Sequence, residues 1–258
     1  MFSNSIWIAS VPRTGSMWTT NIIREIYTVS NFNVLPKHII QYDKEWVDYY
    51  NSNAQLDENE LNIYIFKIHS KLTVLPPRSK IITNIRNPYD ICASHNEFMK
   101  CDLVKSINVA KDLINWKNYY KSLSKDIFEV KFEQIENYTK DLINKLSTFC
   151  NLKLSGIQIE NIIEKYNKSN VQNIIKKNDE YIKKQKNENK ILDNKKIVKF
   201  KNGNFRSFDL YTGFQSGHIS QRKAGQWRDM FSKEEISTII KQLDEIAIKI
   251  IREKAKKI

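Results

Sequence analysis

Four short apolar runs stand out in the first half of the chain. They cover residues 6–11, 61–68, 80–85 and 127–132 and are rich in Ile, Val and Phe. Runs with so few polar positions are typical of strands buried on both faces, as in parallel sheets. We therefore predict a strand at each run.

Apolar residues spaced three and four apart predict helices after these strands. One helix begins beside Trp18, and Pro88 fits the first turn of another, where its missing N–H costs nothing. Further helices are predicted over 103–125, 137–150 and 233–256. Strands that alternate with helices predict one α/β domain over 1–258, with a central, mainly parallel sheet flanked by helices. Ligands of such sheets bind beyond the carboxyl ends of the strands.

The composition is that of a globular protein. Of the 258 residues, 41% are hydrophobic and 28% are charged, which provides for a sizeable core. Three cysteines without a CxxC pair do not predict a disulfide framework. The first residues lack the pattern of a signal peptide, and no run approaches the roughly 20 apolar residues of a membrane span. We expect a reduced, cytoplasmic protein that does not bind membranes.

The net charge of +13 raises the question of a nucleic-acid partner. Residues 167–204 contain eleven Lys, nine Asn and a net charge of +7, which leaves +6 for the rest of the chain. We interpret 167–204 as a solvated Lys/Asn-rich helix and mobile loop; the alternative is a basic lid over an anionic ligand. A nucleic-acid-binding protein would spread its cations and aromatics over a face, so this concentration argues against one.

A candidate anion-binding loop lies between the first strand and its helix. Its sequence is Pro12-Arg13-Thr14-Gly15-Ser16-Met17-Trp18. Unpaired backbone N–H groups at a helix start attract anions, Gly15 permits a close turn, and Ser16 and Arg13 add donors. A plain β–α turn fits the segment equally well. The G-x-x-x-x-G-K-[ST] pattern is missing, which disfavours an ATPase or GTPase.

Two further cationic elements follow. Arg86 ends the strand 80–85, and Ser94 lies about two turns into the next helix, where the pair could grip a second phosphate. Arg222 and Lys223 precede a glycine and a tryptophan and form a third candidate anion grip. Taken singly, each element also fits an ordinary turn before a helix.

Together these motifs resemble the sulfotransferases that use 3′-phosphoadenosine-5′-phosphosulfate (PAPS). Cytosolic members carry a Pro-Lys-Ser-Gly-Thr-Thr-Trp loop, then Arg with Ser eight residues later, and finally Arg-Lys-Gly-x-x-Gly-x-Trp. The corresponding segments are 12–18, Arg86 with Ser94, and 222–227, while Lys67-Ile68-His69 stands at the family's Lys-Thr-His and Phe132-Glu133-Gln134 at its Tyr-Glu-Asp-like strand end. The order matches along nearly the whole chain. The resemblance implies the P-loop-like sulfotransferase fold.

The resemblance also implies roles for individual residues. Arg13 takes the place of the loop lysine at the bridging oxygen and sulfuryl group, and Trp18 and Phe208 are the two walls around adenine. Ser16 and Met17 fill the positions that contact the 5′-phosphate, and Thr14 and Gly15 belong to the same cofactor-binding loop. The 3′-phosphate falls to Arg86, Ser94, Arg222 and Lys223, and the adjoining Ala224 is a further cofactor-binding position. No metal is implied.

Three departures from the family pattern bear on these roles. Arg13 replaces a lysine, and the segment 222–227 is two residues shorter than its counterpart, so its register is open. The Lys-x-x-x-Thr-Val-x-x-x-Glu dimer signature is missing after Trp227, which leaves the oligomeric state undetermined.

His69 is the candidate general base. The strand 61–68 delivers it to the ligand-binding edge beside Lys67, whereas His38, His95 and His218 have no such placement. A neutral imidazole there can take a hydroxyl proton. Lys67 and Arg13 would stabilise the charge that develops on the sulfuryl and bridging oxygens, and Ser94 would orient Arg13.

The expected function is transfer of a sulfuryl group from PAPS to a hydroxyl or amine of a small-molecule acceptor, such as a secondary metabolite. The segment 36–60, rich in aromatics and acids, is interpreted as an acceptor lid that favours a cationic or polyhydroxylated molecule; a solvated amphipathic helix is the alternative. The rival functions are a P-loop-like nucleotide kinase and a basic nucleic-acid-binding protein.

Overall fold

The computed structural model describes residues 4–54, 57–72, 77–123, 126–200, 204–220 and 223–255, with the side chains of 249–255 excepted. Its centre is a five-stranded sheet of order β2-β3-β1-β4-β5, in which every neighbouring pair is parallel. The strands are β1 (Ser5–Ala9), β2 (Asn33–Leu35), β3 (Asn62–Ile68), β4 (Ser79–Ile85) and β5 (Ile127–Lys131). The four predicted strands and the parallel arrangement are confirmed, and the short edge strand β2 is additional.

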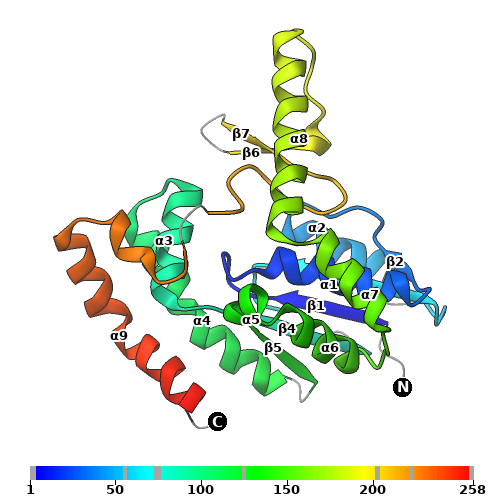
Figure 1. Cartoon of the computed structure of the whole chain (residues 1–258), viewed down its shortest axis with the longest axis horizontal. Helices are drawn as coiled ribbons and strands as arrows, with labels where there is room; N and C mark the ends of the chain where they lie inside the picture. Colours follow the sequence, from blue (N-terminus) through cyan, green and yellow to red (C-terminus); the bar gives the residue numbers. More distant parts are fainter. Residues whose placement is uncertain are drawn as a thin grey trace.

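Helices cover both faces of this sheet (Figure 1). They are α1 (Ser16–Val29), α2 (Asp43–Tyr49), α3 (Pro88–Met99), α4 (Leu103–Leu123), α5 (Phe132–Asn137), α6 (Thr139–Phe149), α7 (Gly156–Lys165), α8 (Lys168–Asn187) and α9 (Lys233–Ala255). A π-helical turn, Tyr50–Ala54, extends α2. Among the described residues no helix combines the length and apolar character that crossing a bilayer requires.

Alternation along β1 explains the two-sided packing. Ile6 and Ile8 point into one core cluster with α1, α6 and α7, whereas Trp7 and Ala9 point into another with α2 and Tyr120 of α4. Successive side chains of a strand face opposite sides, so an all-apolar strand requires a cover on each face. A third cluster joins α3, α4 and α9 beside the sheet.

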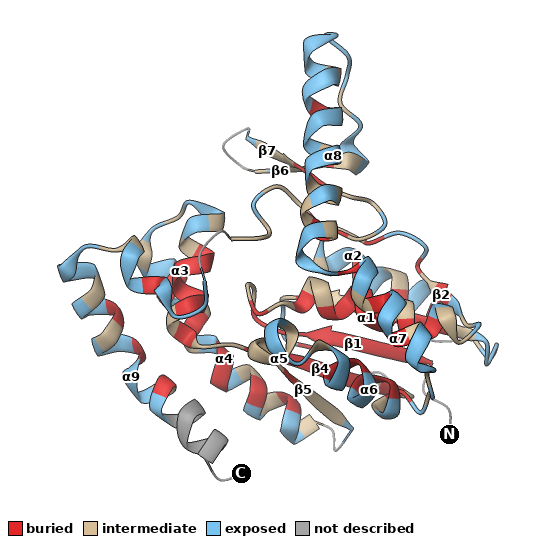
Figure 2. Cartoon of the chain, in the orientation of Figure 1, coloured by how far each residue is buried: buried red, intermediate tan, exposed pale blue. Residues whose placement is uncertain are grey.

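The Lys/Asn-rich segment contains α8, which projects from the body of the molecule in Figure 1 and is largely exposed along its length in Figure 2. Only Val171 and Ile182 of this helix are buried. After α8 the chain forms an antiparallel pair, β6 (Ile197–Lys199) and β7 (Phe205–Ser207). The sequence pattern did not predict this pair, because each strand is three residues long.

The parallel sheet determines where functional residues meet. All carboxyl ends lie at one edge, and β1 lies between β3 and β4. The loop that follows β1 is therefore flanked by the residues that follow β3, beginning with His69, and by those that follow β4, beginning with Arg86.

Candidate active site

The loop after β1 leads directly into the first turn of α1. Its N-cap is Gly15, which has a φ of 89°, and no side chain caps the helix. The positive φ favours glycine, and a Cβ at Gly15 would lie 2.7 Å from the terminal methyl of Ile135 and 3.3 Å from Phe132, so a larger residue would also have to displace side chains of α5. The first turn contains no acidic residue. Its N–H groups are thus suited to an anion.

Arg13 connects this loop to two other parts of the chain. Its Nε donates to Ser94 Oγ of α3 over 3.0 Å, and its Nη2 donates to the His218 carbonyl oxygen over 3.1 Å. Its backbone has a φ of 69°, a left-handed conformation that is uncommon for arginine and is found at functional sites. Burial, together with the charges of Arg86 and Arg206, lowers the Arg13 pKa to about 9. The expected contact between Ser94 and Arg13 is present.

Arg86 lies on the other side of the loop. Its Nη1 donates to the Arg13 carbonyl oxygen over 2.9 Å, and its guanidinium carbon lies 4.0 Å from the centroid of the Phe132 ring. Its buried Nε has no hydrogen-bond partner among the described residues. An unsatisfied buried guanidinium donor is costly, so this atom is available to an anion. The structure therefore brings together Arg13, Arg86 and Ser94.

A buried hydrogen-bond network holds the loop between the strands. Asn84 of β4 receives a hydrogen bond from the Ser10 hydroxyl, donates its backbone N–H to the same hydroxyl, and donates its side-chain amide to Thr19 Oγ1 of α1. All three residues are fully buried. The only signal of this network in the sequence is a lone asparagine inside an apolar strand, which does not predict it.

His69 follows β3 and faces the loop. Its Nδ1 lies 2.7 Å from the Ser10 carbonyl oxygen. A carbonyl only accepts, so Nδ1 carries the proton of the neutral ring and Nε2 keeps its lone pair. Burial, followed by the positive charge of Lys67, lowers the His69 pKa well below its usual value. The ring is neutral at physiological pH, as a general base requires.

Lys67 lies one residue inside the same strand end. Burial lowers its pKa to about 8, and the charge of Asp43 partly offsets that effect. The Asp43 carboxylate, in the first turn of α2, also accepts the backbone N–H of His69 over 2.8 Å. Asp43 is thus a positioning residue that the sequence analysis placed only within the lid segment.

The remaining loop residues have defined contacts. The Thr14 hydroxyl donates to the Val11 carbonyl oxygen, and Ser16 is 4% exposed. The Met17 side chain packs against both central core clusters, so a phosphate would meet its backbone N–H.

Trp18 and Phe208, the residues predicted to flank adenine, pack against different core clusters. The Trp18 indole donates to the Tyr166 carbonyl oxygen over 3.1 Å and packs against the first core cluster. Phe208 is 2% exposed and belongs to the second cluster. The adenine site stays a prediction.

The structure describes only part of the third cationic element, residues 222–227. Arg222 lies outside the described residues, and Lys223 and Ala224 are exposed. The Gly225 N–H donates to both carboxylate oxygens of Asp90, at 3.0 and 3.1 Å. Because Asp90 lies in the first turn of α3, this contact holds the segment beside the helix that carries Ser94.

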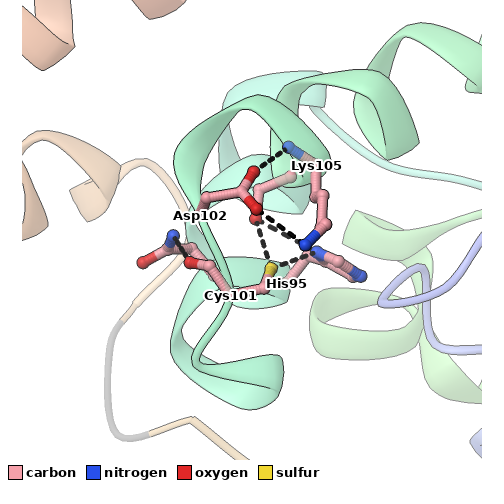
Figure 3. Close-up of polar contacts among 6 residues, drawn as sticks. His95, Cys101, Asp102 and Lys105 are labelled. Carbon is pink, nitrogen blue, oxygen red and sulfur yellow. Dashed lines mark hydrogen bonds and ion pairs between the residues drawn. The ribbon is translucent and has the colours of Figure 1, made fainter.

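The other histidines differ in their surroundings. His95 forms a hydrogen bond with Ser106 Oγ over 3.1 Å and contacts Cys101 Sγ (Figure 3), and burial, followed by the charge of Arg13, lowers its pKa. His218 lies within the field of Arg13, Lys67, Arg206 and His69, and burial with these charges lowers its pKa well below the usual value. No motif around His218 pointed to this position. No group of three or more His, Cys, Asp or Glu suited to a metal ion occurs in the described part of the chain.

Comparison with known proteins identifies the fold and the family of the chain. Solved structures with the same fold include retinol dehydratase with androsterone and the inactive cofactor PAP (TM-score 0.58, 14% identity, 95% of this chain and 81% of that chain). Retinol dehydratase with retinol and PAP gives a TM-score of 0.60 at 15% identity, with the same coverage. Mouse sulfotransferase SULT7A1 with PAP gives 0.61 at 14% identity, over 95% of this chain and 85% of that chain.

No curated protein sequence matches the chain. The family model of the sulfotransferase domain, by contrast, matches residues 3–249. The chain belongs to the sulfotransferase domain family.

Proposed function

We propose that the protein transfers a sulfuryl group from PAPS to a hydroxyl or amine of a small metabolite. The observation that carries the proposal is the arrangement of β3, β1 and β4, whose adjacent carboxyl ends bring His69, the loop of Arg13 and Arg86 to one edge. Two features fit a doubly phosphorylated nucleotide: the uncapped first turn of α1, and the buried, unpartnered Nε of Arg86.

The two phosphate groups of the nucleotide are bound by different residues. The N–H groups of the first turn of α1 hold the 5′-phosphate, and Arg86 and Ser94 hold the 3′-phosphate, with Arg222 and Lys223 as further ligands. PAPS supplies the sulfuryl group, and PAP is its product. The neighbours solved with PAP, retinol or androsterone support a nucleotide donor and a small-molecule acceptor.

His69 acts on the acceptor. Its Nε2 takes the proton of the acceptor hydroxyl while the new O–S bond forms and the S–O bond to the phosphate breaks. The Ser10 carbonyl holds the ring in the required tautomer. Lys67 and Arg13 stabilise the negative charge on the sulfuryl and departing phosphate oxygens.

The proposal is tested by nucleotide binding and turnover. Isothermal titration with PAP and with AMP, which lacks the 3′-phosphate, should show PAP binding roughly 10–100-fold more tightly, the value of hydrogen bonds to a charged group. Labelled PAPS with an acceptor panel should then yield labelled product. Equal affinity for PAP and AMP, with no labelled product, would contradict the proposal.

A further inference from the structure

A second cluster of cations surrounds the ring of Phe98, near the end of α3. The Arg206 guanidinium carbon lies 3.8 Å from the ring centroid, and that of Arg13 lies 4.1 Å from it. The Nη2 of Arg206 donates to the Phe98 carbonyl oxygen. Arg206 comes from β7, so this short antiparallel pair places a cation beside Arg13 that the nucleotide-binding motifs do not include.

Charge compensation for Arg206 is missing among the described residues. It forms no salt bridge there, and its buried Nη1 has no hydrogen-bond partner. Burial of the guanidinium lowers its pKa. The guanidinium also lies 4.8 Å from the centroid of the Phe200 ring, so it is held by two aromatic rings and keeps an unused donor, Nη1, for an anion.

His218 connects this cation to the reacting end of the site. Its ring centroid lies 5.2 Å from that of Phe98. The Gln215 N–H donates to its Nδ1 over 3.2 Å, so the neutral ring carries its proton on Nε2. His218 is therefore a hydrogen-bond donor, the reverse of His69. The fields of Lys67, His69 and Arg206 all act on this ring, so it is near both the general base and Arg206.

We propose that Arg206 and His218 form a subsite for an oxyanion on the acceptor, and that the acceptor is a small hydroxylated carboxylic acid. This inference rests on the proposed sulfuryl transfer. It differs from the cationic acceptor expected from the acids of 36–60, because the Asp43 carboxylate accepts the His69 N–H and lies within the field of Lys67. The charge near His69 that lacks an ion-pair partner among the described residues, that of Arg206, is positive.

Matched acids and esters test this subsite. PAP-loaded protein is titrated with 4-hydroxybenzoate, 4-hydroxyphenylacetate and 4-hydroxycinnamate and with their methyl esters, which keep the hydroxyl and remove the charge. At least one acid should bind 10-fold or more tightly than its ester. In Arg206→Gln that ratio should fall below about threefold, with PAP affinity unchanged.

Arg228→Gln is the matched control, because Arg228 is an exposed arginine that also lies over an aromatic ring, that of Trp227. It should keep the acid preference. Three results would overturn the inference: no acid binds more tightly than its ester, the preference survives in Arg206→Gln, or that variant loses PAP affinity and so belongs to the donor site. If Arg206→Gln does not fold, the acid-to-ester affinity ratios of the wild type and of Arg206→Lys test the inference instead. Failure of sulfuryl transfer itself would appear separately, as absence of PAP binding and of labelled product.

Discussion

The carboxylate of Asp43 accepts the backbone N–H of His69 over 2.8 Å, although the two residues lie 26 positions apart in the chain. This contact ties the first turn of α2 to the end of β3. It places a negative charge beside Lys67, which the same strand end carries. The protonation of Lys67 thus depends on a residue outside the family motifs.

Asp43→Asn should lower the pH at which activity begins to fall on the alkaline side of the pH profile. Asparagine can still accept the His69 N–H, but the charge that raises the Lys67 pKa is lost, so this pKa falls below about 8. If the Lys67 pKa falls by about one unit, the fraction of Lys67 that is protonated at pH 8 falls about fivefold. The basic limb of kcat/KM should therefore move to lower pH. Asp48→Asn, an exposed position, is the control; a limb that stays in place would refute the role of Asp43.

His69→Ala should reduce kcat by at least about 10²-fold, the usual contribution of a general base. PAP affinity should remain within a factor of about two, because the phosphates bind elsewhere. In the wild type the acid limb of kcat/KM should lie below pH 6.5, since the His69 pKa is lowered. His38→Ala is the matched control, because His38 is exposed and its ring packs on Tyr211. Near-normal turnover of His69→Ala would remove the imidazole from the mechanism.

Arg86→Gln should weaken PAP binding by roughly 10–100-fold, the value of hydrogen bonds to a charged group. AMP affinity should change much less, because Arg86 is assigned to the 3′-phosphate. Isothermal titration with both nucleotides measures the difference. Arg24→Gln, which changes a guanidinium that donates to the carbonyl oxygens of Pro36 and Lys37, is the control. Equal losses for PAP and AMP would assign Arg86 to another part of the nucleotide.

Trp46→Ala should lower the free energy of unfolding by about 3–5 kcal/mol, as for other large residues removed from a core. Trp46 is 1% exposed and packs edge-to-face on Phe66, with ring centroids 5.6 Å apart. Tyr42→Ala, at a residue 49% exposed, should change stability by less than about 0.5 kcal/mol. Denaturant unfolding measures both. A small effect of Trp46→Ala would favour a loosely held lid over a packed part of the fold.

Much of the fold followed from local patterns. The apolar runs located β1, β3, β4 and β5, and the helical spacing after them predicted the parallel α/β arrangement. The motif order pointed to the loop of Arg13, to Arg86 and to His69. The short strands β6 and β7 escaped prediction, because three residues are too few to show a period.

Local sequence specifies which residues end the buried strands, because burial on two faces requires continuous apolar runs and polar residues follow where these runs stop. Which strand ends are neighbours, and which contacts hold their side chains, depends on the folded arrangement of the chain. The His69 tautomer depends on a carbonyl 59 residues away, and the position of Arg206 depends on Phe98, 108 residues away. Contacts between such distant residues arise from packing of the whole chain, and no local pattern encodes them.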